Sequence, residues 1–220
     1  MSKYTIILLL FTLCNLASNN AISAELTVTV KSKDGAALTN IAVLVYPEKQ
    51  TAASANSVSL SAVMDQVNRQ FVPHTLVVQK GTRVSFPNSD SVKHHVYSFS
   101  PAKVFELKLY SEIEVDPLLF ETAGEVELGC NIHDWMLGYI YVADTPYFAQ
   151  TDENGVIQLN VPEGKHKVQL WHPRLKDNDR DMMTEVELAN NSSNITLTLN
   201  EDLWPSLGDY EKVEGFSDYD

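Results

Sequence analysis

The sequence predicts an all-β protein. Short runs alternate between apolar and polar side chains, as in residues 26–30, 126–130 and 157–161. Turn-forming pairs such as Asp34-Gly35 and Asn154-Gly155 separate these runs. A period of two residues places one face of each run against a core, and a chain of 220 residues is long enough for one or two compact domains.

The first 24 residues have the pattern of a signal peptide. Lys3 supplies a positive charge, residues 6–13 form an apolar core, and residues 21–24 are suited to cleavage near Ala24. The apolar run is too short to span a membrane as a helix. We therefore expect an exported protein, periplasmic or secreted, with no membrane span.

Cysteine usage points to metal chemistry. Cys14 lies within the expected signal peptide and would be removed with it, which leaves Cys130 as the only cysteine of the exported chain. An exported protein with one cysteine has no disulfide framework. Metal ligation is the simplest explanation for the remaining thiol.

The chain is strongly acidic. It carries 16 Lys and Arg residues against 29 Asp and Glu residues, a formal net charge of −13 at pH 7. This balance argues against a nucleic-acid partner and against binding to an anionic membrane surface. It would steer the protein toward a basic redox partner, although the solubility of an exported protein also explains it.

The N-terminal strands are followed by a loop. Residues 26–31 and 41–46 flank the turn at Asp34-Gly35 and predict a half-buried hairpin or meander. Residues 51–61 are rich in Ala, Ser and Asn and predict a loop or linker. Residues 61–68 give a weak signal for a short helical turn.

The β pattern continues through the middle of the chain. Residues 75–78 and 83–86 predict two strands joined by a turn at Lys80-Gly81. Residues 97–124 contain two prolines and several short apolar runs, which predict short strands without a definable register. Residues 138–142 predict a return strand.

The last third repeats the same kind of pattern. Residues 145–147 begin a second linker, and a turn at residues 152–155 precedes a strand over 157–161 and a returning strand over 167–171. Two further strands are predicted over residues 186–188 and 195–199. The acidic segment 201–220 has no periodicity and predicts a surface-draped or disordered tail.

Four side chains form a candidate metal site. Cys130, His133 and Met136 follow one another at three-residue intervals after a strand, and their thiolate, imidazole and thioether are soft or borderline ligands. His94 lies in another alternating run, where it faces the interior while His95 faces the other way. Two histidines, one cysteine and one methionine are the ligand set of a blue-copper electron-transfer centre.

Residues 71–142 resemble a cupredoxin, a member of the family that includes plastocyanin and amicyanin. The spacing C-x-x-H-x-x-M followed by x-G-x-I-x-V resembles the short amicyanin-type ligand loop. Residues 88–96 resemble the family's N-x-x-x-x-x-H-N-V stretch, which carries the first copper histidine. The resemblance implies a Greek-key β-sandwich. The ligands that it implies for one type 1 copper ion are His94, Cys130, His133 and an axial Met136.

This resemblance implies a one-electron carrier rather than an enzyme, because four protein ligands leave no position for a substrate. His133 on the loop would be the electron port, and the partner would be a redox protein such as a basic cytochrome or a dehydrogenase. Asn88, Asn131 and His95 are candidates for tuning the site. His95 stands where the family usually has asparagine.

Other classes of function stay open. A periplasmic copper-binding or delivery protein would hold exchangeable Cu(I) without intense colour. An enzyme could use an open copper position or a Cys130 nucleophile activated by His133, but no acid–base pair accompanies the motif. A purely adhesive role would leave the ligand cluster unexplained.

The flanking segments, residues 26–47 and 151–199, together resemble a carboxypeptidase-regulatory-like, transthyretin-like β-sandwich. The resemblance is carried by the turn sequences Asp152-x-Asn154-Gly155 and Val161-Pro162-x-Gly164. Chains with this pairing of domains are similar to methylamine utilisation proteins. The segments that this implies are a signal peptide over residues 1–24, a discontinuous sandwich over 25–50 and 149–200, an inserted cupredoxin domain over 60–145, and an acidic tail over 201–220.

Overall fold

The computed structural model describes residues 23–49, 60–111, 115–189 and 192–206. Most of the expected signal peptide, most of the loop over residues 51–61 and most of the acidic tail lie outside the described residues, whereas Ser23 and Ala24 are described as the start of the first strand.

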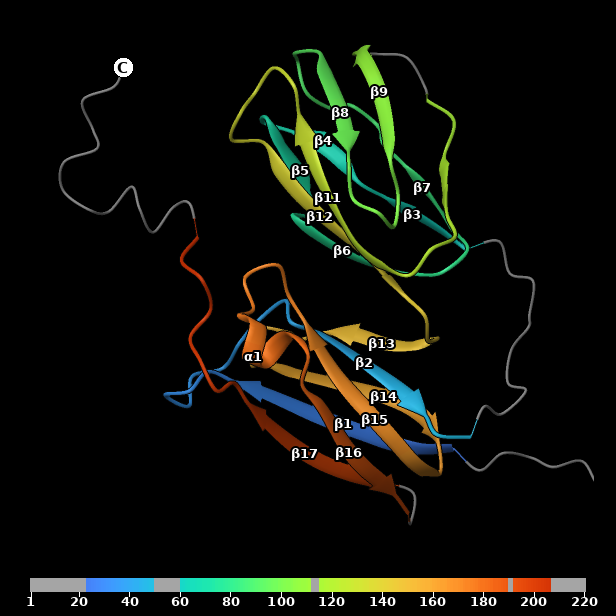
Figure 1. Ribbon diagram of the computed structural model, residues 1–220, viewed down its shortest axis with the longest axis vertical. Coiled ribbons are helices and arrows are strands. Elements are labelled where there is room, and N and C mark those ends of the chain that lie inside the picture. Colours follow the sequence, from blue (N-terminus) through green and yellow to red (C-terminus); the bar gives the residue numbers. More distant parts are fainter. Residues whose placement is uncertain (1–22, 50–59, 112–114, 190–191, 207–220) are drawn as a thin grey trace, which may run out of the picture.

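Nearly all of the described secondary structure is β-strand, arranged as two β-sandwiches (Figure 1). We call the sandwich built from both ends of the described chain the terminal unit and the sandwich built from its middle the central unit. The predicted all-β fold class is confirmed.

The terminal unit packs a sheet of order β14-β1-β17 against a sheet of order β13-β2-β15-β16. Its strands are β1 (Ser23–Lys31), β2 (Ala42–Pro47), β13 (Tyr147–Gln150), β14 (Val156–Pro162), β15 (Gly164–Trp171), β16 (Met183–Leu188) and β17 (Ser192–Thr198). Leu26 and Val28 of the first sheet meet Val43 and Val168 of the second in a buried core.

The central unit packs a sheet of order β10-β7-β3 against a sheet of order β6-β12-β11-β8-β9, with the hairpin β4-β5 at one end. Its strands are β3 (Ser61–Val63), β4 (Asp65–Val67), β5 (Gln70–Val72), β6 (Thr75–Gln79), β7 (Thr82–Ser85), β8 (His94–Ser98), β9 (Phe105–Tyr110), β10 (Leu118–Phe120), β11 (Gly124–Cys130) and β12 (Leu137–Ala143). Cys130 and Met136 belong to the core between these sheets, together with Val84 and Val96.

The prediction that the first two strands form a hairpin is wrong. β1 pairs with β14 and β17, whereas β2 pairs with β13 and β15 in the other sheet. The prediction that this segment is half-buried also fails for β2, because both of its faces are covered. Val43 and Val45 face the core of the terminal unit, while Ala42 and Leu44 belong to a different buried cluster.

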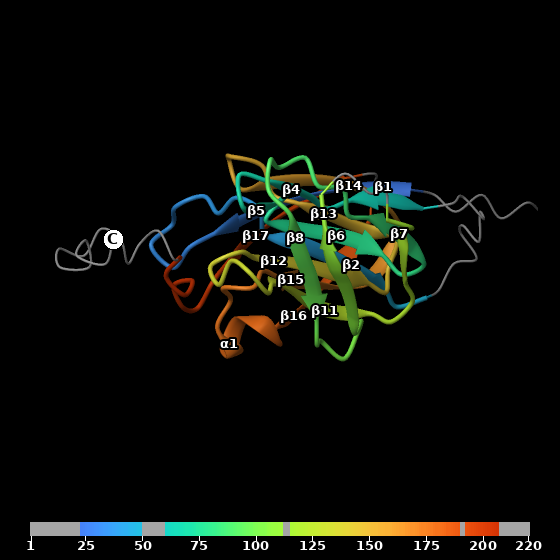
Figure 2. The ribbon, with the colours of Figure 1, turned by 90° about the horizontal axis from the view of Figure 1, so that it is seen from above.

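The expected helical turn over residues 61–68 is also wrong, because β3 and β4 occupy that segment and pair with β7 and β5. Backbone pairing in the sheets outweighs a weak local signal. Helix in the described residues is limited to α1 (Asp177–Arg180), at the edge of the molecule (Figure 2). No helix in this part of the chain is both long enough and apolar enough to cross a membrane.

The two units share a buried interface. Its fully buried apolar residues are Ala42, Leu44, Ala143 and Trp171. The ring of Trp171 from the terminal unit lies 4.8 Å from the ring of Tyr141 in the central unit. The indole Nε1–H of Trp171 donates to Glu125 Oε2 at 2.9 Å, and Arg180 Nη1 lies 3.4 Å from the same oxygen. The interface is therefore an apolar cluster, and the carboxylate of Glu125 at its edge is paired with Trp171 and Arg180.

His172 follows Trp171 of this interface, and its lowered pKa predicts that the free energy of unfolding falls in acid. Burial, followed by electrostatic repulsion from Arg174 and His74, lowers its pKa from 6.5 to about 4. The unfolded chain binds a proton below pH 6.5 while the folded chain does not, so stability falls between pH 6.5 and about 4. This imidazole should contribute a loss of about 3 kcal/mol across that window.

Denaturant unfolding of the chelator-treated protein at pH 7 and pH 4 measures this effect. The His172→Gln variant should lose less stability between the two pH values than the wild-type chain. An equal loss in both proteins would show that the buried imidazole is not its source.

Candidate metal centre

The predicted ligands lie at the end of the central unit that points away from the terminal unit (Figure 1). Cys130 is the last residue of β11, and His94 is the first residue of the neighbouring strand β8. The two strands pair antiparallel, with Cys130 opposite Val96. This pairing brings two residues far apart in sequence to the same end of one sheet.

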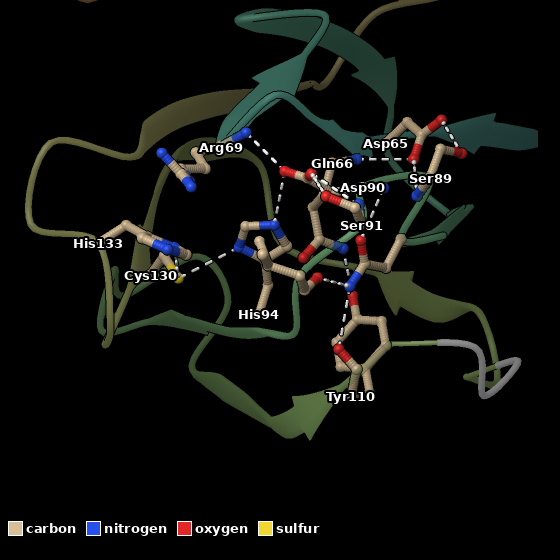
Figure 3. Close-up of polar contacts among 12 residues, drawn as sticks. Asp65, Gln66, Arg69, Ser89, Asp90, Ser91, His94, Tyr110, Cys130 and His133 are labelled. Carbon is tan, nitrogen blue, oxygen red and sulfur yellow. Dashed lines mark hydrogen bonds and ion pairs between the residues drawn. The ribbon is translucent and has the colours of Figure 1, made fainter.

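The Cys130 sulfur lies between two imidazole nitrogens. Its Sγ is 3.7 Å from His94 Nδ1 and 3.5 Å from His133 Nδ1, and the three ligand atoms all lie within 4.8 Å of one another (Figure 3). The centres of the two imidazole rings are 5.0 Å apart. The structure therefore brings His94, Cys130 and His133 together.

These separations fit a bound metal ion. Nitrogen and sulfur ligands sit roughly 2.0 and 2.3 Å from an ion such as zinc, and two such ligands in a tetrahedral arrangement are about 3.5 Å apart. The thiol of Cys130 is free and buried. A thiol and two imidazoles are also the donors that suit copper. The donor set and its spacing both accommodate a copper ion.

Met136 lies inside the central unit with about 1% of its surface exposed, in the same cluster as Cys130. Two backbone hydrogen bonds tighten the loop between them. His133 N donates to the Cys130 carbonyl at 3.4 Å, and Met136 N donates to the His133 carbonyl at 2.9 Å. The loop therefore returns to the core at Met136. The role of Met136 as the axial ligand stays a prediction.

His95 lies outside the cluster, on the opposite face of the strand from His94. His94 is fully buried, whereas His95 is partly exposed and its Nε2 lies 2.8 Å from Glu106 Oε1. The alternation in the sequence predicted this difference. His95 is therefore placed for a surface ion pair rather than for ligation beside Cys130.

His133 lies on the outer side of the cluster, next to an exposed apolar rim. Its ring is 5.7 Å from the ring of Trp135, which is 60% exposed, and Ile132 is also exposed. Partial burial lowers the pKa of His133, and His94 and Arg69 lower it further. The imidazole is therefore neutral at pH 7, with a lone pair free to bind a metal.

Asn88 shapes the loop that leads to His94. Its Nδ2 donates to the carbonyls of Val92 at 2.9 Å and Tyr110 at 3.0 Å, and its Oδ1 accepts from Asp90 N at 2.9 Å. Among the described residues, no hydrogen bond joins the Cys130 sulfur to the side chain of Asn88, Asn131 or His95. The expected tuning of the sulfur by these three side chains stays a prediction.

Sequence reasoning missed Asp90, whose carboxylate contacts the predicted ligand His94. Asp90 Oδ2 is 3.1 Å from His94 Nε2 and accepts the backbone N–H of Arg69 at 2.6 Å. The Arg69 hydrogen bond is the main cause of a lowered pKa for Asp90, with a smaller contribution from His94. A carboxylate four residues before a histidine was the only signal available in the sequence, and such a spacing is not specific.

A scan against protein-family models found no match to this chain, and a search of curated proteins found none either.

Solved structures that match the chain include copper proteins. A purple cupredoxin from Nitrosopumilus maritimus is 24% identical, with 39% of this chain and 100% of that chain covered and a TM-score of 0.33. The reduced Cu(I) form of an amicyanin mutant is 23% identical, with 46% and 97% covered and a TM-score of 0.34. A copper-containing nitrite reductase from Thermus scotoductus SA-01 is 23% identical, with 45% and 25% covered and a TM-score of 0.36.

Gly129, which precedes Cys130, provides a test of how tightly β11 packs against Tyr97 on β8. A Cβ atom at position 129 would lie 2.6 Å from the ring of Tyr97 on β8. Gly129→Ala should therefore lower the free energy of unfolding by about 1–3 kcal/mol, measured by denaturant titration. Tyr97→Ser in the same chain should remove most of that cost, because the ring that collides with the new methyl group is gone. If the cost is unchanged by Tyr97→Ser, the collision is not its cause.

Proposed function

We propose that the protein is an exported type 1 copper protein that carries one electron at a time between redox partners. The ligands would be His94, Cys130, His133 and Met136. The observation that carries this proposal is the placement of the Cys130 sulfur 3.5 and 3.7 Å from the imidazole nitrogens of His133 and His94.

The ligand chemistry supports electron transfer. Bound copper supplies a one-electron couple between Cu(II) and Cu(I). The sulfur atoms of Cys130 and Met136 favour the reduced ion, while neutral imidazoles suit both states. Cys130 is the last residue of β11 and His94 is the first residue of β8, and these two strands pair with each other. Both side chains are therefore held by the sheet rather than by a loop. Such a support keeps the ligands in place when the charge of the ion changes.

The burial pattern suggests where electrons enter and leave. His94, Cys130 and Met136 are buried, whereas His133 is partly exposed beside Ile132 and Trp135. An imidazole edge inside an exposed apolar rim suits brief contact with another protein. The net charge of −13 favours a basic partner, such as a cytochrome or a dehydrogenase.

The remaining parts of the proposal follow from the sequence. The signal-peptide pattern of residues 1–24 supports export to the periplasm or beyond the cell. The turn sequences of the terminal unit support its resemblance to carboxypeptidase-regulatory-like sandwiches. We propose an electron carrier rather than an enzyme, since a thiol, two imidazoles and a thioether would fill a four-coordinate site.

Spectroscopy of the copper-loaded, oxidised protein tests the proposal. We expect an intense visible band from thiolate-to-Cu(II) charge transfer, narrow copper hyperfine splitting in the EPR spectrum, and reversible uptake of one electron per protein. Cys130→Ser and His94→Gln should abolish the band, because each removes a ligand. His95→Gln is the matched control and should keep the band, since the neighbouring imidazole faces the surface.

A colourless protein, or one with an ordinary tetragonal Cu(II) spectrum, would contradict the electron-carrier proposal. Weak, exchangeable Cu(I) binding without colour would instead favour a copper-delivery protein.

A further inference from the structure

One carboxylate oxygen of Asp90 joins the candidate metal centre to a distant hairpin. Asp90 lies in the loop between β7 and β8, with about 9% of its side chain exposed. Its Oδ2 is 3.1 Å from His94 Nε2, while the other nitrogen of that ring, Nδ1, faces the Cys130 sulfur at 3.7 Å (Figure 3). The imidazole is therefore held between a carboxylate on one side and a thiol on the other.

The carboxylate is itself held firmly. Its Oδ2 accepts the backbone N–H of Arg69 at 2.6 Å, and its Oδ1 accepts the backbone N–H of Ser91 at 2.7 Å. Arg69 lies in the turn of the β4-β5 hairpin, where Asn68 and Arg69 have φ values of 52° and 58°. This left-handed geometry is that of a two-residue hairpin turn with positive φ at both positions. The turn aims a backbone N–H at Asp90 and so sets where the carboxylate lies.

We propose that Asp90 is a positioning residue for the metal ligand His94, an inference that rests on the proposed function. Asp90 accepts the Nε2–H of His94, which fixes the tautomer that leaves the Nδ1 lone pair free and holds that lone pair toward Cys130. The negative charge of Asp90 makes the imidazole a stronger donor. A stronger donor stabilises Cu(II) more than Cu(I), so Asp90 lowers the reduction potential of the site.

A second histidine–carboxylate contact in the chain provides a control for the contact between Asp90 and His94. Glu106 meets the adjacent His95 at 2.8 Å, so the same kind of histidine–carboxylate contact occurs one residue away. That pair is on the outer face of the strand, and the Glu106 side chain is 55% exposed. Glu106→Gln removes one negative charge close to the site without touching His94. This variant therefore separates the effect of losing the contact with His94 from the effect of losing one negative charge on copper affinity and reduction potential.

Copper affinity and reduction potential of three variants test the proposal. Asp90→Ala should weaken Cu(II) binding about 10- to 100-fold, the usual effect of losing such a partner. Asp90→Asn should retain most of the affinity, because its amide oxygen can still accept the His94 Nε2–H, but its reduction potential should rise. Glu106→Gln should leave both quantities near their wild-type values.

Nitrogen-15 NMR of the metal-free protein provides a readout that needs no copper. His94 should be in the Nε2–H tautomer in the wild-type chain and in Asp90→Asn, and should become a mixture of tautomers in Asp90→Ala. Circular dichroism on the same samples reports whether each variant is folded. If Asp90→Ala does not fold, the tautomer and the reduction potential of Asp90→Asn decide the question.

The outcomes separate the two proposals. A wild-type protein without the charge-transfer band overturns the proposed function, while the His94 tautomer in the metal-free chain still reports on Asp90. A coloured wild-type protein whose Asp90 variants match Glu106→Gln in affinity, potential and tautomer overturns the positioning role alone.

Discussion

The register between β8 and β11 is the constraint on which the candidate metal centre depends. It sets Cys130 opposite Val96 and Gly129 opposite Tyr97. A slip of one residue would turn the Cys130 sulfur out of the core and away from His94. The same register places the Tyr97 ring where a side chain at position 129 would have to be, so glycine at that position fits the pairing. Strand pairing, more than the loop, therefore decides which face receives the thiol.

The terminal unit covers a surface that the central unit would otherwise expose. Tyr139 and Tyr141 of β12 point away from the core that contains Cys130 and pack instead against the cluster around Leu44 and Trp171. The large sheet of the central unit is thus covered on both faces along β12. This cover lies at the opposite end of the central unit from the loop between β11 and β12, so the terminal unit does not cover the candidate metal centre (Figure 1).

A chain of hydrogen bonds holds His94 on the side of its ring that faces away from Cys130. The backbone N–H of Arg69 reaches Asp90 across 21 positions of the sequence, and Asp90 in turn reaches His94. Because the His94 imidazole is fully buried, this contact gives the ring one orientation, since an unpaired ring N–H in the interior would cost a hydrogen bond. An imidazole held in this way need not be reoriented if an ion binds.

Local patterns in the sequence determined the β class, the approximate positions of many of the strands, the spacing of Cys130, His133 and Met136, and the inward direction of His94. All of these depend on side-chain alternation or on neighbours a few residues apart. Tertiary structure alone decided that β1 and β2 belong to different sheets and that Asp90 contacts His94. Those features depend on which distant segments pair and which surfaces they cover, and a short window of sequence holds no information about either.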